Sequence, residues 1–461
     1  MENNNDFLGT EKVGRLVLRL AVPAVLAQIV NMLYNVVDRI YIGHIDVIGA
    51  DALTGMGVCT PIILAVAAFA SLIAMGAAPK ASISMGRGDN KEAGRIMGNA
   101  LTALITIAVV LTTVVLIWRE PFLNLFGASE NTIGYAMDYI TIYAAGTIFV
   151  QLTLGMNMFI TAQGFAKTGM LTVLIGAISN IVLDPIFIFV FGMGVKGAAL
   201  ATIISQAISA VWVIVFLCGK KTVLRLNLRN MKPDIKLILS CAALGMAPFI
   251  MQITESVLSM CFNASLLKYG GDMAVGAMTI LTSVMQFVMM PLQGFSQGAQ
   301  PVISYNFGAK KLNRVKDAFI MLMKLSLGFS FVMCAVIMVF PRFITGLFAS
   351  DQNLIDFAAW AIRIYMAGTC IFGLQIACQF TFIALGYAKH AVFLAVLRKI
   401  ILLIPLIYIL PLIITGDKTM AVYLAEPVAD VIAVCITVTM FVKKFKKTLK
   451  SAELESAQAE V

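Results

Sequence analysis

Runs of about twenty apolar residues recur along the whole chain, and this recurrence limits the possible folds more than any other feature of the sequence. An α-helix needs a run of about that length to cross the hydrocarbon core of a membrane. Backbone groups find no water there, so a spanning segment must be a helix or part of a closed barrel. We count twelve such runs, near residues 15–42, 53–83, 93–118, 133–161, 168–191, 196–218, 236–267, 273–303, 315–341, 355–385, 391–414 and 419–442. The sequence therefore predicts an all-α, multi-pass membrane protein.

The composition supports a membrane protein and argues against other classes. The 461 residues are 60% hydrophobic and 13% charged, whereas soluble domains carry about 25% charged residues. The net charge of +10 is divided among short strips between apolar runs, without the basic surface and stacking aromatics of nucleic-acid-binding modules. The eight cysteines form no CxxC pair, which favours core residues over disulfides or metal ligands. Residues 1–14 are polar and acidic and do not resemble a cleavable signal.

The lysines and arginines predict the orientation in the membrane. If both termini are placed on one side, the connections on that side hold most of these residues, including the strips at 219–236 and after 442. Basic connections of this kind stay in the cytoplasm. We therefore expect a plasma-membrane (cell inner membrane) protein with both termini in the cytoplasm. We also expect it to be a monomer.

The chain contains an internal repeat. YAAGT at 143–147 recurs as YMAGT at 365–369, LFGASE at 125–130 as LFASDQ at 347–352, QGFAK at 163–167 as LGYAK at 385–389, and ISMGRGDNK at 83–91 as ISYNFGAKK at 303–311. The offset is 222 residues for the first three pairs and 220 for the last. Four matches in the same order indicate duplication of a six-span unit. Two units with an even number of spans share one orientation in the membrane.

The repeat predicts two pseudo-symmetric six-helix lobes. Their expected limits are 1–218 for the N-lobe, 219–236 for a cytoplasmic linker, 237–442 for the C-lobe, and 443–461 for a basic and then acidic cytoplasmic tail. Two lobes with a substrate path between them are typical of alternating-access transporters. A channel can share this symmetry, so the function depends on the sites.

One carboxylate lies in the middle of a predicted span that carries no other charge. Asp184 is costly at this depth, by about 2.5–3.5 kcal/mol on insertion scales, so it must be buried against protein, protonated or bound to a cation. Asn180 lies one turn earlier on the same helical face, and Pro185 indicates a break in the helix. A hydrogen bond that only joins two helices is the alternative interpretation.

A second carboxylate lies on the first span. Asn31, Tyr34 and Asp38 share one stripe of an otherwise apolar helix, and such a stripe faces the bundle interior rather than lipid. The alternative is an interfacial acid that pairs with Arg39 or faces water. Thr202, on the sixth span, can add a hydroxyl group.

Four residues of the N-lobe make up the predicted ion-coupling site, namely Asp38, Asn180, Asp184 and Thr202. Their oxygens suit a Na⁺ ion, and a pair of carboxylates can instead exchange a proton. Both ions stay open, and no cofactor beyond the coupling ion is expected. Asn263 and Leu406 occupy the C-lobe positions that correspond to the two aspartates, so ion coupling is expected in the N-lobe.

The C-lobe carries its own charges within predicted spans, namely Glu255, Arg398, Glu426 and Asp430. Glu255 either binds a cationic substrate or pairs with Arg398. Methionines and phenylalanines are abundant, and packing explains most of them. Some of them can line an adaptable cavity for amphipathic or cationic guests. The candidate substrate residues are Asn31, Tyr34, Glu255, Met285, Phe287, Met289 and Arg398.

Several kinds of chemistry lack their motifs. No GxxxxGK[ST] phosphate loop occurs, and neither histidine has metal-ligand spacing. No Ser/His/Asp arrangement is suggested either. We therefore expect a protein that is not an enzyme, and that draws free energy from an ion gradient or from the gradient of its substrate.

With these residues identified, the chain resembles the MATE (multidrug and toxic compound extrusion) family of transporters over nearly its whole length. The resemblance rests on the 6+6 layout and on five segments, PAVLAQIVNMLYNVVDRIYIG at 23–43, GRGD at 86–89, QGFAKTGM at 163–170, SNIVLDPIF at 179–187 and AEPVAD at 425–430. It implies an ion-coupled antiporter that exports drug-like organic compounds, many of them cationic.

In that family, aspartates on the first and fifth spans bind the coupling H⁺ or Na⁺, with help from nearby Asn and Thr. The resemblance carries this role over to Asp38, Asn180, Asp184 and Thr202. NorM-like members also use a carboxylate on the tenth span, and the segment IYMAGTCIFGLQIACQFTFIAL at 364–385 of this sequence has none. That departure favours the DinF-like branch and argues against a C-lobe cation site.

Two other functions are alternatives. A flippase for lipid-linked oligosaccharides belongs to the related superfamily, and it should show a strongly cationic cavity, whereas the N-lobe interior here is acidic. A signalling protein or channel is the third possibility. The repeat and the sparse soluble portions argue against signalling, and a channel should give conductance in a bilayer.

Overall fold

The computed structural model describes residues 7–45 and 49–459, and that part of the chain is helical with no strand. Its elements are α1 (Phe7–Thr10), α2 (Val13–Gly43), α3 (Gly49–Gly86), α4 (Asn90–Leu125), α5 (Ile133–Ala145), α6 (Thr147–Ala162), α7 (Ala166–Pro185), η1 (Ile186–Val190), α8 (Val195–Cys218), η2 (Leu228–Met231), α9 (Ile235–Gly308), α10 (Leu312–Val339), α11 (Pro341–Gly346), α12 (Gln352–Tyr365), α13 (Thr369–Ala384), α14 (Ala388–Val396), η3 (Leu397–Leu403), α15 (Ile404–Ile413) and α16 (Lys418–Ala459). Of the three η elements, η1 and η3 are π-helical.

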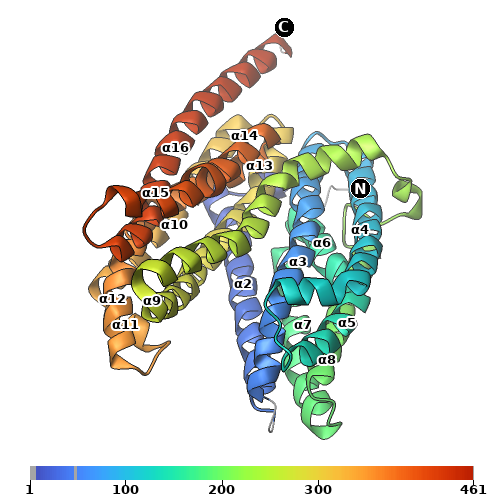
Figure 1. Ribbon diagram of the computed structural model, residues 1–461. Coiled ribbons are helices and arrows are strands. Elements are labelled where there is room, and N and C mark those ends of the chain that lie inside the picture. The colour runs from blue at the N-terminus through green and yellow to red at the C-terminus, as the bar shows by residue number, and fades with distance from the viewer. Residues whose placement is uncertain (1–6, 46–48, 460–461) are drawn as a thin grey trace.

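Nine helices in the described residues are long and apolar enough to cross a membrane. Two bent pairs, α5 with α6 (56°) and α12 with α13 (50°), each supply one more span. α9 holds two spans, a first arm and a second arm, because Gly271 adopts φ 65° and ψ −165° and the chain reverses there (Figure 1). The prediction of twelve spans is confirmed, and most predicted ends lie within about one helical turn of the observed ends.

The repeated YAAGT and YMAGT motifs lie at the two bends. Gly146 separates α5 from α6, and Gly368 occupies the equivalent position between α12 and α13. A Cβ at Gly146 would overlap the side chain of Ile203 on α8, and one at Gly368 would press against Asp430 on α16. The repeat therefore keeps glycine where each bent span touches the last span of its own lobe.

The repeat also governs hydrogen bonds between helices. Ser82 Oγ on α3 donates to the Ala162 carbonyl at 3.0 Å, and Ser304 Oγ on α9 donates to the Ala384 carbonyl at 2.8 Å. The two donors are 222 residues apart, and so are the two acceptors. The two lobes, α2–α8 and α9–α16, are therefore pseudo-symmetric, as the sequence predicted.

One predicted repeat pair is wrong in its register. The segments at 83–91 and 303–311 were expected to align with an offset of 220, but the structure aligns them with an offset of 222. Gly88 and Lys310 are equivalent at that offset, and both have positive φ angles, 80° and 57°. Lys310 keeps this left-handed turn even though a side chain makes it less favourable. Matching the Ile-Ser dipeptides at 83 and 303 misled the sequence comparison.

The lobes touch where α3 crosses the second arm of α9. A Cβ at Gly86 would overlap the Tyr305 carbonyl oxygen, and a Cβ at Gly308 would overlap the Ile83 carbonyl oxygen. Small residues at such crossings let two membrane helices approach backbone to backbone. We call this region the closed end. It lies beside α1, and the two lobes diverge away from it toward the lower edge of Figure 1.

Candidate functional site

Three helices of the N-lobe bring the predicted ion-coupling residues together. Asp38 on α2 and Asn180 and Asp184 on α7 are all buried, with Asp184 fully enclosed. Asn180 Nδ2 donates to Asp184 Oδ1 at 3.1 Å, and lies 3.5 Å from Thr202 Oγ1 on α8. The i, i+4 spacing on α7 sets the first contact, and packing of α7 against α8 sets the second.

The two aspartates face each other across the α2–α7 interface. Their carboxyl groups lie close enough to interact electrostatically. Arg39, the next residue on α2, is exposed, so it does not cover the Asp38 carboxyl. Two adjacent buried carboxylates repel each other unless a proton or a cation lies between them. The geometry thus favours an exchangeable positive charge over an interfacial acid or a hydrogen bond that only joins helices.

The donor set at this site fits a proton or a Na⁺ ion. Within the described residues, three buried oxygens have no hydrogen-bond partner, namely Asp38 Oδ1, Asn180 Oδ1 and Asp184 Oδ2. Buried polar atoms normally have partners, and carboxylate, amide and hydroxyl oxygens are the ligands that hard cations prefer. With the Thr202 hydroxyl, these oxygens could bind a proton or a Na⁺ ion, whose positive charge would neutralise one carboxylate.

A cavity of about 40 Å³ lies directly beside this site. Asn31 and Tyr34 line it from α2, as the stripe on the first span predicted, and Asn180 and Thr202 line it too. The other polar residues around it are Thr153, Thr172, Ser205, Gln206 and Ser209. A polar cavity of this size holds about three water molecules.

The helix after Asp184 changes type rather than breaking. α7 runs through Pro185 and continues as the π-helical turn η1, in which the Phe191 N–H bonds to the Ile186 carbonyl at 2.9 Å. Proline has no N–H to donate, which disfavours a regular α-helical pattern around it. π-Helical turns occur frequently at functional sites. The predicted helix break is therefore corrected to a local widening of the helix.

The C-lobe holds a buried charge cluster on spans equivalent to those of the ion-coupling site. Arg398 on η3 pairs with Glu426 and Asp430 on α16, at 2.7 Å in each case. Its guanidinium also lies 4.4 Å from the ring centroid of Phe372. All three charged side chains are at most 7% exposed. The buried carboxylates of the C-lobe are therefore neutralised by a fixed arginine of the same lobe.

Glu255 pairs with Lys399, and not with Arg398 as one interpretation of the sequence expected. Lys399 is buried and also donates to the Met251 carbonyl at 3.2 Å. The side chain of Glu255 is 63% exposed. Sequence reasoning missed Lys399, although its place beside Arg398 inside a predicted span was a usable signal. A carboxylate exposed within a span must face a water-filled space, because lipid would not tolerate it.

The three cavity candidates on the second arm of α9 do not lie together. Met285 and Met289 pack against the core of the C-lobe. Phe287 is 45% exposed and lies on the opposite face of the helix, with its ring centroid 6.2 Å from that of Phe348. Only the two methionines therefore share one face, as residues four apart on a helix do.

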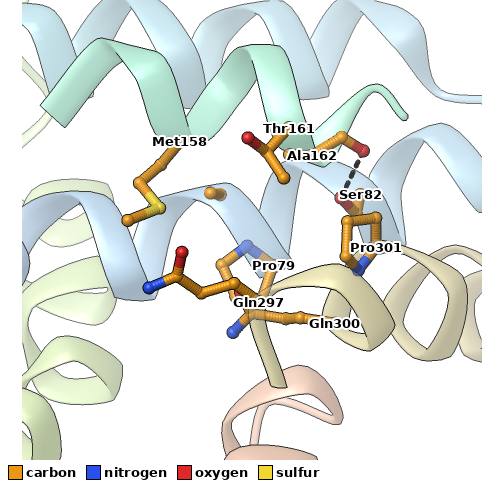
Figure 2. Close-up of a pocket in the computed structure, with 9 residues that line it drawn as sticks. Pro79, Ser82, Met158, Thr161, Ala162, Gln297, Gln300 and Pro301 are labelled. Atoms are coloured by element: carbon orange, nitrogen blue, oxygen red, sulfur yellow. Dashed lines mark hydrogen bonds between the residues drawn. The ribbon is translucent and has the colours of Figure 1, made fainter. Parts of the chain in front are cut away.

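A small cavity lies between the lobes near the closed end (Figure 2). Pro79 of α3 and Pro301 of α9 line it, and they are repeat equivalents. Gln297 and Gln300 of α9 line it as well, facing Met158 and Thr161 of α6. The Gln300 Nε2 atom is buried without a partner. The sequence interpretation did not identify this cavity, because its residues come from distant spans.

Two six-span lobes that close on each other at one end and carry buried charges inside define a membrane transporter rather than an enzyme. The MatE family model matches residues 23–186 and 248–409. The chain belongs to the MatE family, and it is a multi-pass membrane protein.

Named relatives and solved structures agree with this assignment. Multidrug export protein MepA of Staphylococcus haemolyticus is 25% identical over 397 residues, which are 86% of each chain. MepA of Staphylococcus aureus (strain NCTC 8325 / PS 47) is 25% identical over 399 residues, 86% of this chain and 87% of that one. The predicted DinF-like branch stays a prediction.

Solved structures share the whole fold. A structure titled as MATE in complex with MaD3S has a TM-score of 0.90 at 20% identity and covers 98% of this chain and 100% of the other. One titled as an outward-facing multidrug resistance MATE family transporter has a TM-score of 0.90 at 20% identity, over 97% and 99% of the two chains. The predicted MATE-like fold of twelve spans is confirmed.

Proposed function

We propose that this protein is a secondary active antiporter that exports drug-like organic compounds, often cationic, in exchange for H⁺ or Na⁺. The carboxyl pair of Asp38 and Asp184 carries the proposal, since one oxygen of each and the neighbouring Asn180 Oδ1 are buried without a partner. The relatives of this chain are named as multidrug export proteins, which supports the same proposal. The monomer is the proposed working unit, because each chain has both lobes.

The closed end is proposed to face the cytoplasm. It carries α1, the strip between α8 and α9, and the loop residues Arg87, Lys310 and Lys311. Basic connections of membrane proteins stay on the cytoplasmic side. The described arrangement then presents the diverging ends of the lobes to the outside, from which a coupling ion can enter and to which a substrate can leave.

Ion binding changes the charge between α2 and α7. With both aspartates ionised, the two helices carry like charges at their interface, and they separate or admit water to relieve the repulsion. A bound H⁺ or Na⁺ removes that repulsion and favours close packing of α2 on α7. The ion thereby binds more tightly to one packing of the lobe than to the other. A ligand shifts a conformational equilibrium through such a difference in affinity.

The substrate's positive charge is proposed to meet Glu255. The C-lobe cluster contains three carboxylates, on Glu255, Glu426 and Asp430, against two cations, on Arg398 and Lys399. It retains one negative charge when all five groups are ionised. Glu255 is the exposed member, so an organic cation can approach it and compete with the Lys399 ammonium group.

Glu255→Gln is expected to raise the KM for export of a cationic substrate such as ethidium roughly tenfold, since one charge-assisted contact is lost. The KM for a neutral substrate should not change. Transport rates in proteoliposomes at varied substrate concentration measure both values. Asp272→Asn is the matched control, because it removes an exposed carboxylate at the turn within α9. Equal losses for charged and neutral substrates would contradict the assignment.

Proteoliposomes decide which ion is coupled. At a clamped membrane potential, we expect either an imposed Na⁺ gradient or an imposed pH gradient to drive ethidium uphill, and the other gradient to have little effect. Vesicles with the same protein and no gradient provide the control. Equilibration of ethidium without uphill accumulation under both gradients would refute antiport and indicate a passive pathway.

A flippase for lipid-linked pyrophosphates has weaker support. Arg398 and Lys399 are buried intramembrane cations of the kind that such a substrate would need. Both are already paired with carboxylates, and the cluster is net negative. A pyrophosphate group would be repelled there, so organic cation export agrees better with the charges.

A further inference from the structure

The segment before the first helix of the N-lobe reaches across to the C-lobe at the closed end. The Leu8 carbonyl accepts hydrogen bonds from Asn306 Nδ2 at 2.9 Å and from Arg314 Nη2 at 3.2 Å. The Gly9 carbonyl accepts from Lys311 Nζ at 2.9 Å. All three donors belong to α9, α10 or the turn between them. We call residues 7–11 with these donors the first clasp.

The first clasp is buried, and it contacts the N-lobe as well. Leu8 is fully enclosed, and Asn306 is too. A Cβ at Gly164, between α6 and α7, would overlap the ring of Phe7. Arg314 Nη2 also donates to the Glu11 carbonyl at 2.7 Å. The segment is therefore wedged between the lobes, and its backbone carbonyls are satisfied by C-lobe side chains.

The segment before the first helix of the C-lobe makes the reciprocal contact. The Asn230 carbonyl accepts from Asn99 Nδ2 at 3.3 Å, and the Met231 carbonyl accepts from Thr102 Oγ1 at 2.8 Å. Both donors lie on α4 of the N-lobe. A Cβ at Gly98, on the same helix, would overlap the Asn230 carbonyl oxygen. We call residues 230–234 with these donors the second clasp.

Asp234 strengthens the second clasp at the start of α9. Its N–H donates to Asn99 Oδ1 at 2.6 Å, and its carboxylate pairs with Arg95 at 2.5 Å. The same carboxylate caps α9 by accepting from the Leu237 N–H. Helix α9 therefore begins on the surface of α4, in the opposite lobe.

The two clasps are equivalent by the repeat. Leu8 and Gly9 are 222 residues before Asn230 and Met231, and their four carbonyls are the ones held in the two clasps. The donors are not equivalent, since those of the first clasp lie at the end of α9, at the start of α10 or between them, and those of the second lie inside α4. Each half of the chain thus secures the same two carbonyls with different residues.

We infer that the crossed clasps hold the closed end shut. Asn306 and Asn99 are positioning residues, because their hydrogen bonds determine how readily that end opens. Each clasp ties the first span of one lobe to the body of the other. The lobes can separate at the closed end in only two ways. Either both clasps release, or each first span (α2 and the first arm of α9) leaves its own lobe and stays bound to the opposite one. This inference rests on the proposed function in one respect, since only alternating access requires that end to open.

Spin-label distances test the inference without any transport. Lys167 on α7 and Lys389 on α14 are exposed repeat equivalents near the closed end. In a background without the eight native cysteines, labels at these two positions report separation of the lobes in the absence of substrate and of any ion gradient. Failure of the proposed antiport would leave this measurement unaffected, so the two ideas fail separately.

Asn306→Leu and Asn99→Leu are each expected to raise the fraction of molecules with the longer label distance about tenfold, because each removes a buried amide of its clasp. Asn306 loses its hydrogen bond to the Leu8 carbonyl. Asn99 loses its bonds with the Asn230 carbonyl and the Asp234 N–H.

Gln151→Leu is the matched control. Gln151 is a buried amide whose Nε2 donates to the Val66 carbonyl at 2.7 Å, within the N-lobe. It should leave the distances unchanged.

Folding of the leucine variants is checked by gel filtration and by the apparent melting temperature. If either variant is misfolded, Arg314→Gln and Thr102→Val replace it, since they remove single donors of the first and second clasp. Unchanged distances in well-folded variants of both clasps overturn the inference. A longer label distance in the variants of one clasp alone overturns the reciprocal arrangement. An equally longer distance in Gln151→Leu indicates general loosening of the protein and overturns the inference.

Discussion

Asp38→Asn and Asp184→Asn are each expected to reduce ion-driven ethidium export by a factor on the order of 10–100, the usual range of coupling between two ligands. An amide has the size of a carboxyl group but cannot carry the negative charge that holds H⁺ or Na⁺. Without that charge, the ion no longer favours one packing of α2 on α7. Export under an imposed gradient, in cells or proteoliposomes, measures the loss.

The stability of these variants distinguishes lost coupling from misfolding. Each removes one of two neighbouring buried carboxyl groups, so the apparent melting temperature should stay the same or rise. Asp51→Asn is the matched control, because it makes the same chemical change at an exposed position on α3, and it should export normally. Full ion-driven export by both site variants would refute the proposed coupling site.

Arg398→Met is expected to destabilise the protein strongly. Arg398 is the shared partner of Glu426 and Asp430, and all three are buried. Removing one partner of a buried ion pair leaves uncompensated charge in a low-dielectric region, at a cost of about 3–5 kcal/mol. The apparent melting temperature of the purified protein should fall clearly, and the yield of folded protein should fall with it.

Two companion variants define the cause. Arg398→Met combined with Glu426→Gln and Asp430→Asn should recover most of the stability, because no unpaired charge then stays buried. Lys399→Met should cost less than Arg398→Met, since its partner Glu255 is 63% exposed and water can solvate it. A triple variant as unstable as Arg398→Met would indicate that packing of the guanidinium on Phe372, and not charge compensation, dominates.

Prediction from sequence succeeded where the signal is local. Asn180 and Asp184 share a helical face because they are four residues apart, and the structure joins them by a hydrogen bond. It failed where a local pattern misled, as with the offset of 220 in one repeat pair, which the left-handed turns at Gly88 and Lys310 correct to 222. It also failed at Lys399, whose pairing with Glu255 no spacing rule indicates.

The sequence by itself determined the number of spans, the duplication and the presence of costly charges inside the membrane. These are properties of single segments, because a helix in lipid satisfies its own backbone and needs only sufficient apolar length. Only the tertiary structure decided which charges meet. Asp38 reaches Asp184, and Lys399 reaches Glu255, across interfaces between helices that are distant in the chain. The π-helical turns η1 and η3 also shift side chains around the helix axis, and the crossed clasps exist only once both lobes are packed together.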